Sequence, residues 1–389
     1  MIDAEDIPAS WTLRRLNDVC ETRTGGTPNR GNADFFRGSI PWIKSGALKD
    51  SLIVSAEELI TDEAVDSSNA KVFPKGTLLM AMYGANVGKL GRLGIDAATN
   101  QAICAFFPRS DILSGFLWQY LRLIREELIL SSFGAAQPNI SQAFIRRLEL
   151  PVPPLTEQER IVSRIESLTT RAQELAEHTQ AIASDMQRAV ASFYERLAAE
   201  APQKPLEAVA RPVRRPITTT PEGSYPELGL RSFGKGTFHK PALSGTEVGS
   251  KRIFRIHAGD LVFSNVFAWE GAIAVAQPED DGRAGSHRYI TYLADPEQST
   301  AEFLCWHFLT PRGLEDIRAA SPGSAGRNRT LGLERLKQIQ VPVPPIEEQR
   351  RFTELVKRQR EITIHAASIT EDLRKFEAAL LAKAFRGEL

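Results

Sequence analysis

The chain has 389 residues, 42% of them hydrophobic, which is enough apolar material for two ordinary cores. Its 48 basic and 48 acidic residues balance, so net charge alone predicts neither a nucleic acid nor a membrane surface as partner. The three cysteines lie far apart, which argues against a disulfide framework or a zinc site. No apolar run approaches the roughly 20 residues of a membrane helix, and the N-terminus is acidic rather than signal-like. We therefore expect a cytoplasmic protein without a membrane partner.

Residues 1–150 are predicted to form a mixed α/β domain. Short stretches bounded by glycine and proline, at 41–44 and 76–84, predict strands. Residues 116–130 carry apolar side chains at helical spacing and predict one packed helix. The domain ends at the prolines of 151–154, where the backbone should be extended.

A long helix is predicted directly after these prolines. Thr156 and Glu159 have the spacing of a capping box. Apolar residues then alternate in steps of four and three, which is the pattern of a coiled-coil seam. The seam consists of Ile161, Ile165, Leu168, Ala172, Leu175, Thr179, Ile182, Met186, Ala189 and Phe193. The helix should end before Pro202.

The proline motif returns in the second half of the chain. Residues 150–158 read LPVPPLTEQ, and residues 341–349 read VPVPPIEEQ, 191 positions later. A repeat this long indicates a duplicated module rather than a solenoid. Between the motifs, residues 256–265 echo residues 73–80 at a smaller offset, so the modules share an order of elements but differ in loop length. Varied loops on one scaffold suggest two binding regions of different specificity.

A second long helix follows the second motif. Its predicted seam consists of Phe352, Leu355, Gln359, Ile362, Ala366, Ile369, Leu373, Phe376 and Leu380. Either seam alone would be an exposed apolar stripe, so the two helices are expected to pack on each other. Parallel and antiparallel arrangements both satisfy the pattern.

Charge is unevenly distributed within the second half. Residues 211–255 contain nine basic residues against three acidic ones. Such a local excess is suited to phosphate groups, although a solvated loop face is an equally good interpretation.

Several stretches together carry a family resemblance. The helix openings read PVPPLTEQERIVSRIESL and PVPPIEEQRRF, and the chain ends with LAKAFRGEL. Shorter matches are Pro41-Trp42-Ile43, Phe73-Pro74-Lys75-Gly76-Thr77, Asn139-Ile140-Ser141 and Gly326-Arg327-Asn328-Arg329-Thr330. Along the whole chain they resemble the DNA-specificity subunit of type I restriction–modification systems.

The resemblance implies an α+β fold with two α/β target-recognition domains, each with a small twisted sheet. Two long helices would separate them and form an antiparallel coiled coil, giving a pseudo-two-fold internal repeat. The recognition domains would be residues 1–150 and 202–340, and the spacer helices would be residues 151–201 and 341–389.

The resemblance also implies a non-catalytic, sequence-specific DNA-recognition subunit. Each recognition domain would read one half of a bipartite, asymmetric site in double-stranded DNA. The coiled coil would set the spacer and dock two methyltransferase subunits. The cofactor S-adenosylmethionine would lie on those subunits rather than on this chain, and motor-nuclease restriction subunits would join the complex for cleavage. A different function, a coiled-coil scaffold or adaptor that joins protein partners without reading DNA, fits the neutral net charge.

No catalytic, cofactor-binding or metal-ligating set is expected on the chain. DNA contacts should come from polar and aromatic side chains on loops, because Arg and Lys suit guanine, Asn and Gln suit adenine, and Ser and Tyr suit phosphate. For every candidate the alternative is an ordinary surface or core position. In the first domain the candidates are Lys44, Ser45, Tyr83, Asn86, Lys89, Gln137 and Asn139. In the second they are Arg231, Ser232, Lys235, Asn265, Trp269, Arg288, Arg327, Asn328 and Arg329.

Overall fold

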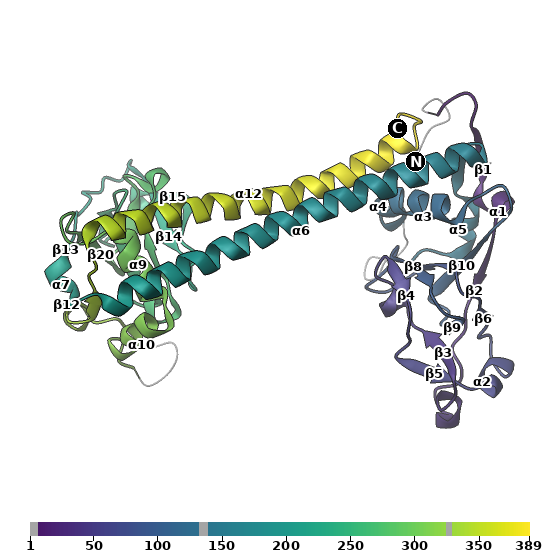
Figure 1. The fold of residues 1–389 in the computed structure, drawn as a ribbon, viewed down its shortest axis with the longest axis horizontal. Coiled ribbons are helices and arrows are strands. Elements are labelled where there is room, and N and C mark those ends of the chain that lie inside the picture. Colours follow the sequence, from purple (N-terminus) through teal and green to yellow (C-terminus); the bar gives the residue numbers. More distant parts are fainter. Residues whose placement is uncertain (1–6, 132–138, 324–328) are drawn as a thin grey trace. The chain divides into compact units, whose positions relative to one another are not determined.

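A computed structural model describes residues 7–131, 139–323 and 329–389 (Figure 1). The chain forms two compact units. Unit 1 consists of Met1–Glu177 and Ser368–Leu389, and unit 2 consists of His178–Ala367. Within the described residues, no helix is long and apolar enough to cross a membrane.

The central sheet of unit 1 has the strand order β2-β10-β7-β8-β4. Its pairs are antiparallel except for β4 with β8. Leu78 and Met80 lie in the cluster on one face, and Leu79 and Ala81 in the cluster on the other, as the alternation of a strand requires. The strands are β2 (Cys20–Thr24), β4 (Ser51–Ile53), β7 (Leu78–Ala81), β8 (Leu90–Leu93) and β10 (Ile103–Pro108).

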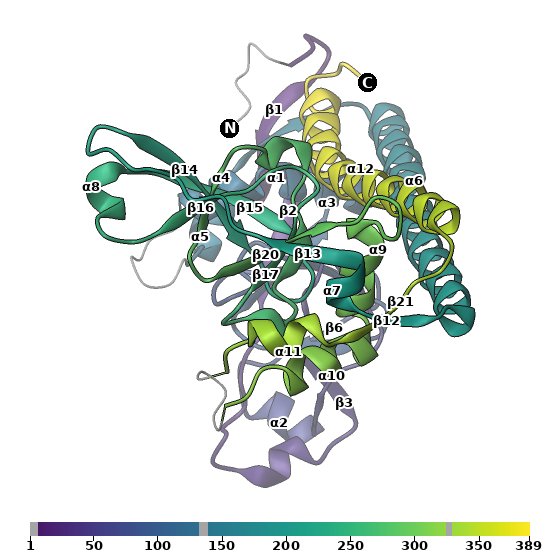
Figure 2. The same ribbon diagram turned by 90° about the vertical axis from the view of Figure 1, so that its left-hand side faces the viewer.

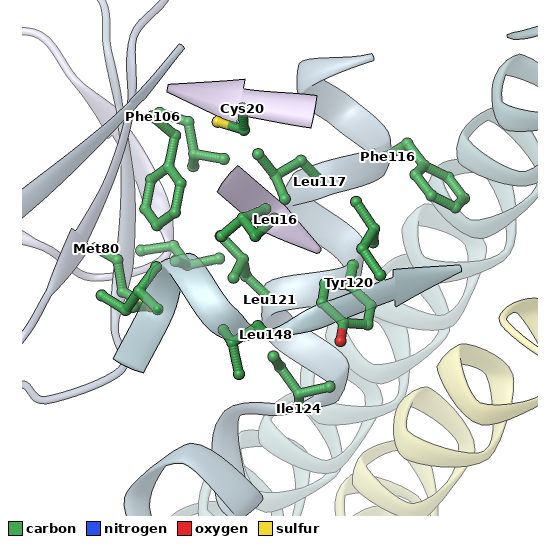
Figure 3. Packing of buried hydrophobic residues seen from close by; sticks show 14 of the residues in the cluster. Leu16, Cys20, Met80, Phe106, Phe116, Leu117, Tyr120, Leu121, Ile124 and Leu148 are labelled. Atoms are coloured by element: carbon green, nitrogen blue, oxygen red, sulfur yellow. The ribbon is translucent and has the colours of Figure 1, made fainter. Parts of the chain in front are cut away.

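Helix α3 (Ser114–Leu123) packs against this sheet and also contacts the long helices of its unit (Figure 3). Leu117 and Leu121 share a buried cluster with Met80 and Phe106 of the strands. The single helix predicted at 116–130 is wrong, because Ile124 leaves helical geometry and separates α3 from α4 (Arg125–Leu130).

A second sheet in unit 1 has the order β5-β3-β9-β6 and packs around Trp42 and Ile60. A two-stranded ribbon, β1 with β11, brings the ends of the domain together. These strands are β1 (Thr12–Arg15), β3 (Ile40–Ile43), β5 (Glu58–Ile60), β6 (Val72–Phe73), β9 (Ala97–Thr99) and β11 (Glu149–Val152). The remaining helices are α1 (Leu16–Val19), α2 (Asp62–Asp66) and α5 (Gln142–Arg147).

Unit 2 repeats the first scaffold. Its antiparallel sheet has the order β13-β20-β17-β18, which matches β2-β10-β7-β8 strand for strand. Helix α9 (Ala301–Leu309) covers it as α3 does in unit 1, and α7 (Leu206–Val209) and α11 (Leu333–Lys337) match α1 and α5. The strands are β13 (Ala210–Val213), β17 (Leu261–Ser264), β18 (Ile273–Val275) and β20 (Tyr289–Ala294).

The second sheet of unit 2, of order β15-β14-β19-β16, differs from that of unit 1 and contains the long β14–β15 hairpin. A ribbon of β12 with β21 matches β1 with β11. The other strands and α-helices of unit 2 are β12 (Gln203–Pro205), β14 (Ser224–Leu230), β15 (Thr237–Ser244), β16 (Ile253–Arg255), β19 (Ala284–Ser286), β21 (Gln340–Pro342), α8 (Gly245–Val248) and α10 (Pro311–Ala319).

The long helices α6 (Leu155–Glu200) and α12 (Ile346–Ala384) pack side by side in opposite directions (Figure 2). In unit 1, Ile165 near the start of α6 lies in one buried cluster with Leu381 near the end of α12. In unit 2, Tyr194 near the end of α6 packs on Phe352 near the start of α12. The pairing left open by the sequence is therefore antiparallel, and the fold class expected from the resemblance is confirmed.

Part of the predicted seam is wrong. Leu175 and Ile182 are 56% and 57% exposed, whereas Ala183, one position after Ile182, and Val190, one position after Ala189, are buried. Ala189 is likewise exposed on α6, as is Phe376 on α12. An α-helix drifts about 20° per heptad against an ideal repeat of 3.5 residues, so over several heptads the contact line moves to the neighbouring position.

Candidate nucleic-acid interface

Both units build a loop site at the same place in the scaffold. In unit 1, the amide of Ile140 donates to the carbonyl oxygen of Met82 at 2.7 Å, which joins the β7–β8 loop to the segment before α5. In unit 2, the amide of Leu331 donates to the carbonyl oxygen of Asn265 at 2.7 Å, which joins the β17–β18 loop to the segment before α11. These bonds bring together candidates that are far apart in sequence.

In unit 1 the loop site is stiffened from within. The Asn86 side-chain amide donates to the carbonyl oxygens of Gly46 and Leu48, at 3.1 Å each, and to that of Ser45 at 3.4 Å. Tyr83 forms a backbone bridge with exposed Asn139 and is itself half-buried, and burial raises the pKa of its phenol. Asn86 therefore holds the loop containing Ser45 and has a structural part in the site.

The two lysines predicted in unit 1 are neutralised by neighbouring carboxylates. Lys44 Nζ lies 2.8 Å from Glu58 and 3.3 Å from Glu57, and the hydrogen bond to Glu58 raises the pKa of the lysine. Lys89 Nζ lies 2.9 Å from Asp50. Burial opposes ionisation of Asp50, but hydrogen bonds from Lys89 and the backbone, together with a nearby arginine, bring its pKa below the usual value.

In unit 2, three of the predicted cations lie over aromatic rings. Lys235 lies over the ring of Phe233, with Nζ 6.0 Å from the centroid. The guanidinium of Arg231 lies 5.0 Å from the Phe238 centroid, and that of Arg329 lies 5.4 Å from the Trp269 centroid. None of the three cations has a carboxylate partner among the residues that the structure describes. They are therefore better placed than Lys44 and Lys89 to meet phosphate.

The remaining candidates of unit 2 frame these cations. Ser232 Oγ donates to Glu270 at 3.1 Å, which ties the β14–β15 turn to the β17–β18 loop. The backbone amide of Asn265 donates to the carbonyl oxygen of exposed Arg288 at 2.8 Å. The side-chain oxygen of Asn265 is buried and has no hydrogen-bond partner in the described part of the chain. Gln137, Arg327 and Asn328 lie outside the described residues.

Sequence reasoning missed the role of the glutamine in each proline motif. Gln158 is 0% exposed. Its Oε1 accepts the amide of Leu113 at 2.9 Å, and its Nε2 donates to the carbonyl oxygens of Asp111 at 2.9 Å and Pro153 at 3.0 Å. This set of bonds, the Gln158 clip, fastens the start of α3 to the start of α6.

Gln349 makes the same three bonds in unit 2. Its Oε1 accepts the amide of Thr300 at 3.1 Å, and its Nε2 donates to the carbonyl oxygens of Gln298 at 2.9 Å and Pro344 at 2.8 Å. The repetition of Glu-Gln after the prolines was the sequence signal for these clips. Both glutamines are buried, and their polar atoms are engaged within the chain, so neither side chain is available to a partner.

The predicted capping box is wrong, because Thr156 does not precede the helix. Helix α6 begins at Leu155, and the Pro154 carbonyl oxygen already accepts the amides of Glu157 and Gln158. Thr156 therefore lies inside the first turn, one residue after the start of the helix.

An aromatic stack joins α3 or α9 to the helix pair in each unit. In unit 1, Phe385 packs on Phe116 and Tyr120, with centroids 4.8 and 5.6 Å apart. In unit 2, Tyr194 takes the place of Phe385, and its hydroxyl lies 2.7 Å from Nδ1 of His307. Burial and, to a lesser extent, nearby Arg312 lower the pKa of His307 to about 4, so the imidazole is neutral at neutral pH.

Two copies of one α+β scaffold, each with a loop site and each clipped to a paired helix, define a duplicated recognition protein. A family model described as the type I restriction modification DNA specificity domain matches residues 8–182. Over these residues the chain is similar to the DNA-specificity subunits of type I restriction–modification systems, which confirms the resemblance carried by the proline motifs.

Individual relatives agree with this assignment. The chain is 28% identical to the MjaIX specificity subunit of Methanocaldococcus jannaschii, over 41% of this chain and 38% of the relative. It is 20% identical to the EcoKI specificity subunit of Escherichia coli K12, over 100% of this chain and 91% of the relative. The fold resembles the crystal structure of the HsdS subunit from Thermoanaerobacter tengcongensis, with a TM-score of 0.59, 18% identity and 98% coverage of both chains.

Proposed function

We propose that the chain is a sequence-specific DNA-recognition subunit in which each unit reads one half of a bipartite, asymmetric site. The observation that carries the proposal is the duplicated loop site, built on one scaffold but with different loops and different second sheets. A shared scaffold suits a shared substrate, the DNA duplex, and different loops suit different half-site sequences. This pattern does not favour an adaptor without a DNA role.

The charge distribution supports the same function. The whole chain is neutral, yet unit 2 presents Arg231, Lys235 and Arg329 on aromatic rings with no carboxylate partner among the described residues. Phosphate neutralisation needs such unpaired cations at one surface and does not need a basic protein overall. Lys44 and Lys89 are ion-paired, so unit 1 should rely more on backbone groups, Tyr83 and Asn139.

The partners and the domain limits form part of the proposal. Residues 1–150 and 202–340 act as target-recognition domains, and residues 151–201 and 341–389 act as spacer helices. The helix pair docks two methyltransferase subunits, which carry S-adenosylmethionine and methylate adenine, and restriction subunits join for cleavage. This chain then contributes specificity without catalysis, and the complex acts in the cytoplasm.

Mapping methylated adenines tests the proposal. We expect a bacterial genome expressing this chain with its methyltransferase subunit to carry one bipartite methylated motif with a fixed gap. Exchanging residues 202–340 for the corresponding region of a relative should change one half of the motif and leave the other half intact. A genome without any new methylated motif, or a chimera in which both halves change, would contradict the proposal.

A further inference from the structure

Phe233 has an unusual conformation for its residue type. The residue is 75% exposed, and its backbone φ is +63°. Among the described residues only one other non-glycine, Asp50, has a positive φ. Aspartate tolerates this region, whereas a bulky aromatic residue is a clear outlier there. Since exposure of a large apolar ring and backbone strain are both unfavourable, the position calls for a functional explanation.

The loop around Phe233 holds this conformation firmly. The Phe233 amide donates to the Glu270 carbonyl oxygen at 2.8 Å, and the Gly234 amide donates to the Gly271 carbonyl oxygen at 2.9 Å. Gly234 and Gly236, which follow Phe233 in the turn between β14 and β15, also adopt positive φ. The ring is therefore presented outward by a hydrogen-bonded turn.

The surroundings of the ring match nucleic acid better than protein. Lys235 lies over the Phe233 ring, Arg231 lies in the same turn, and Arg329 lies over Trp269 in the neighbouring loop. An apolar partner surface would leave these unpaired charges desolvated, which is costly. DNA offers a phosphate for each cation and base faces for the exposed ring.

We propose that Phe233 is a base-stacking residue of unit 2. On binding the duplex, its ring contacts a base step that has been partly unstacked, while Lys235 contacts the adjacent phosphate. The inference rests on the proposed function and deepens it. Phe233 would contribute to half-site recognition through the shape and stacking of the DNA, without a hydrogen bond to a base edge. Flexible pyrimidine–purine steps should be favoured at this position.

A Phe233→Gly variant separates this role from stability. Glycine adopts positive φ without strain, so the variant should unfold at a temperature no lower than the wild type. Phe233→Tyr retains the aromatic face and serves as the conservative variant. Leu130→Ala is the matched control, because Leu130 is an 84% exposed apolar residue of unit 1.

The experiment uses the full chain with its methyltransferase partner and duplexes that carry the mapped motif. 2-Aminopurine is placed at successive positions in both half-sites, since its fluorescence rises when the base unstacks. We expect a rise at one step of the half-site read by unit 2 with the wild type and with Phe233→Tyr, and none with Phe233→Gly. The glycine variant should bind about 10- to 100-fold more weakly, whereas Leu130→Ala should bind as the wild type does.

The outcomes separate this inference from the proposed function. If the wild type does not distinguish the mapped motif from other duplexes, both are overturned. If the wild type is selective and Phe233→Gly gives the same affinity and fluorescence, only the stacking role fails. Loss of methyltransferase association in Phe233→Gly, with naked-DNA binding unchanged, would show that the ring docks a protein instead.

Discussion

The Gln158 clip yields the sharpest quantitative prediction. Gln158→Ala removes three hydrogen bonds from a fully buried side chain and leaves one amide and two carbonyl oxygens without their partner. A buried polar group that loses its partner costs about 1–3 kcal/mol, and water entering the vacated space recovers part of this. We therefore expect the junction between α3 and α6 to lose about 4 kcal/mol, which is roughly a thousandfold increase in local opening.

Hydrogen exchange followed by mass spectrometry measures this opening in each unit separately. Gln158→Ala should lower the protection of amides at 111–123 and leave those at 298–309 unchanged. The repeat supplies the matched control, because Gln349→Ala removes the equivalent bonds in unit 2 and should give the opposite pattern. Effects of the two substitutions should add in the double variant, since the clips share no partner.

Two results would refute this reasoning. Unchanged protection at 111–123 in Gln158→Ala would show that the three bonds contribute nothing that solvent does not replace. Equal loss of amide protection in both units would show that each clip does not act only on its own unit. Gln158→Glu gives a further check, because a carboxylate oxygen facing the Asp111 and Pro153 carbonyl oxygens should destabilise unit 1 more than alanine does.

Three further predictions concern the aromatic stacks and the cations. His307 has a folded pKa of about 4 against about 6.5 when unfolded, so its contribution should be fully present above pH 6.5 and lost as pH falls toward 4, by up to about 3 kcal/mol. Urea unfolding of unit 2 in His307→Phe should show a smaller dependence over this range, and an unchanged slope would contradict the assignment. Phe385→Ala removes a fully buried ring and should destabilise unit 1 by about 3–5 kcal/mol in urea unfolding, whereas a change below about 1 kcal/mol would show that the site collapses without cost. Lys235→Gln should reduce the salt dependence of DNA binding by about one phosphate contact. Lys240→Gln is the control and should leave the salt dependence unchanged, because Lys240 is paired with a glutamate. Equal slopes of binding affinity against salt concentration in the two variants would refute the phosphate role.

Much of the architecture could be predicted from the sequence. The proline motifs at 150–158 and 341–349 predicted two modules, each followed by a long helix, and the structure has α6 and α12 at these places. Such features follow from local rules, because prolines force extended backbone and apolar residues at helical spacing must be buried. The family resemblance, which added the direction of the helix pair, has the same origin in these motifs.

The partners of individual side chains could not be predicted in this way. Lys89 and Lys235 are both loop lysines that the sequence does not distinguish. In the structure Lys89 is paired with Asp50, whereas Lys235 lies over an aromatic ring. Asn86 holds three carbonyl groups some 40 positions away in the chain, which no spacing rule indicates. Each of these roles depends on which loops meet.

The duplication, the order of the elements and the presence of two apolar helix seams are evident in the sequence. The apolar pattern left the direction of the helix pair open, and the structure shows it to be antiparallel. The structure also revealed the shift of the seam from Ile182 and Ala189 to Ala183 and Val190, and the buried roles of Gln158 and Gln349. The reason is physical. A seam's period is a property of one helix, whereas its direction, its drift and the partners of a buried amide depend on contacts between residues distant in the chain.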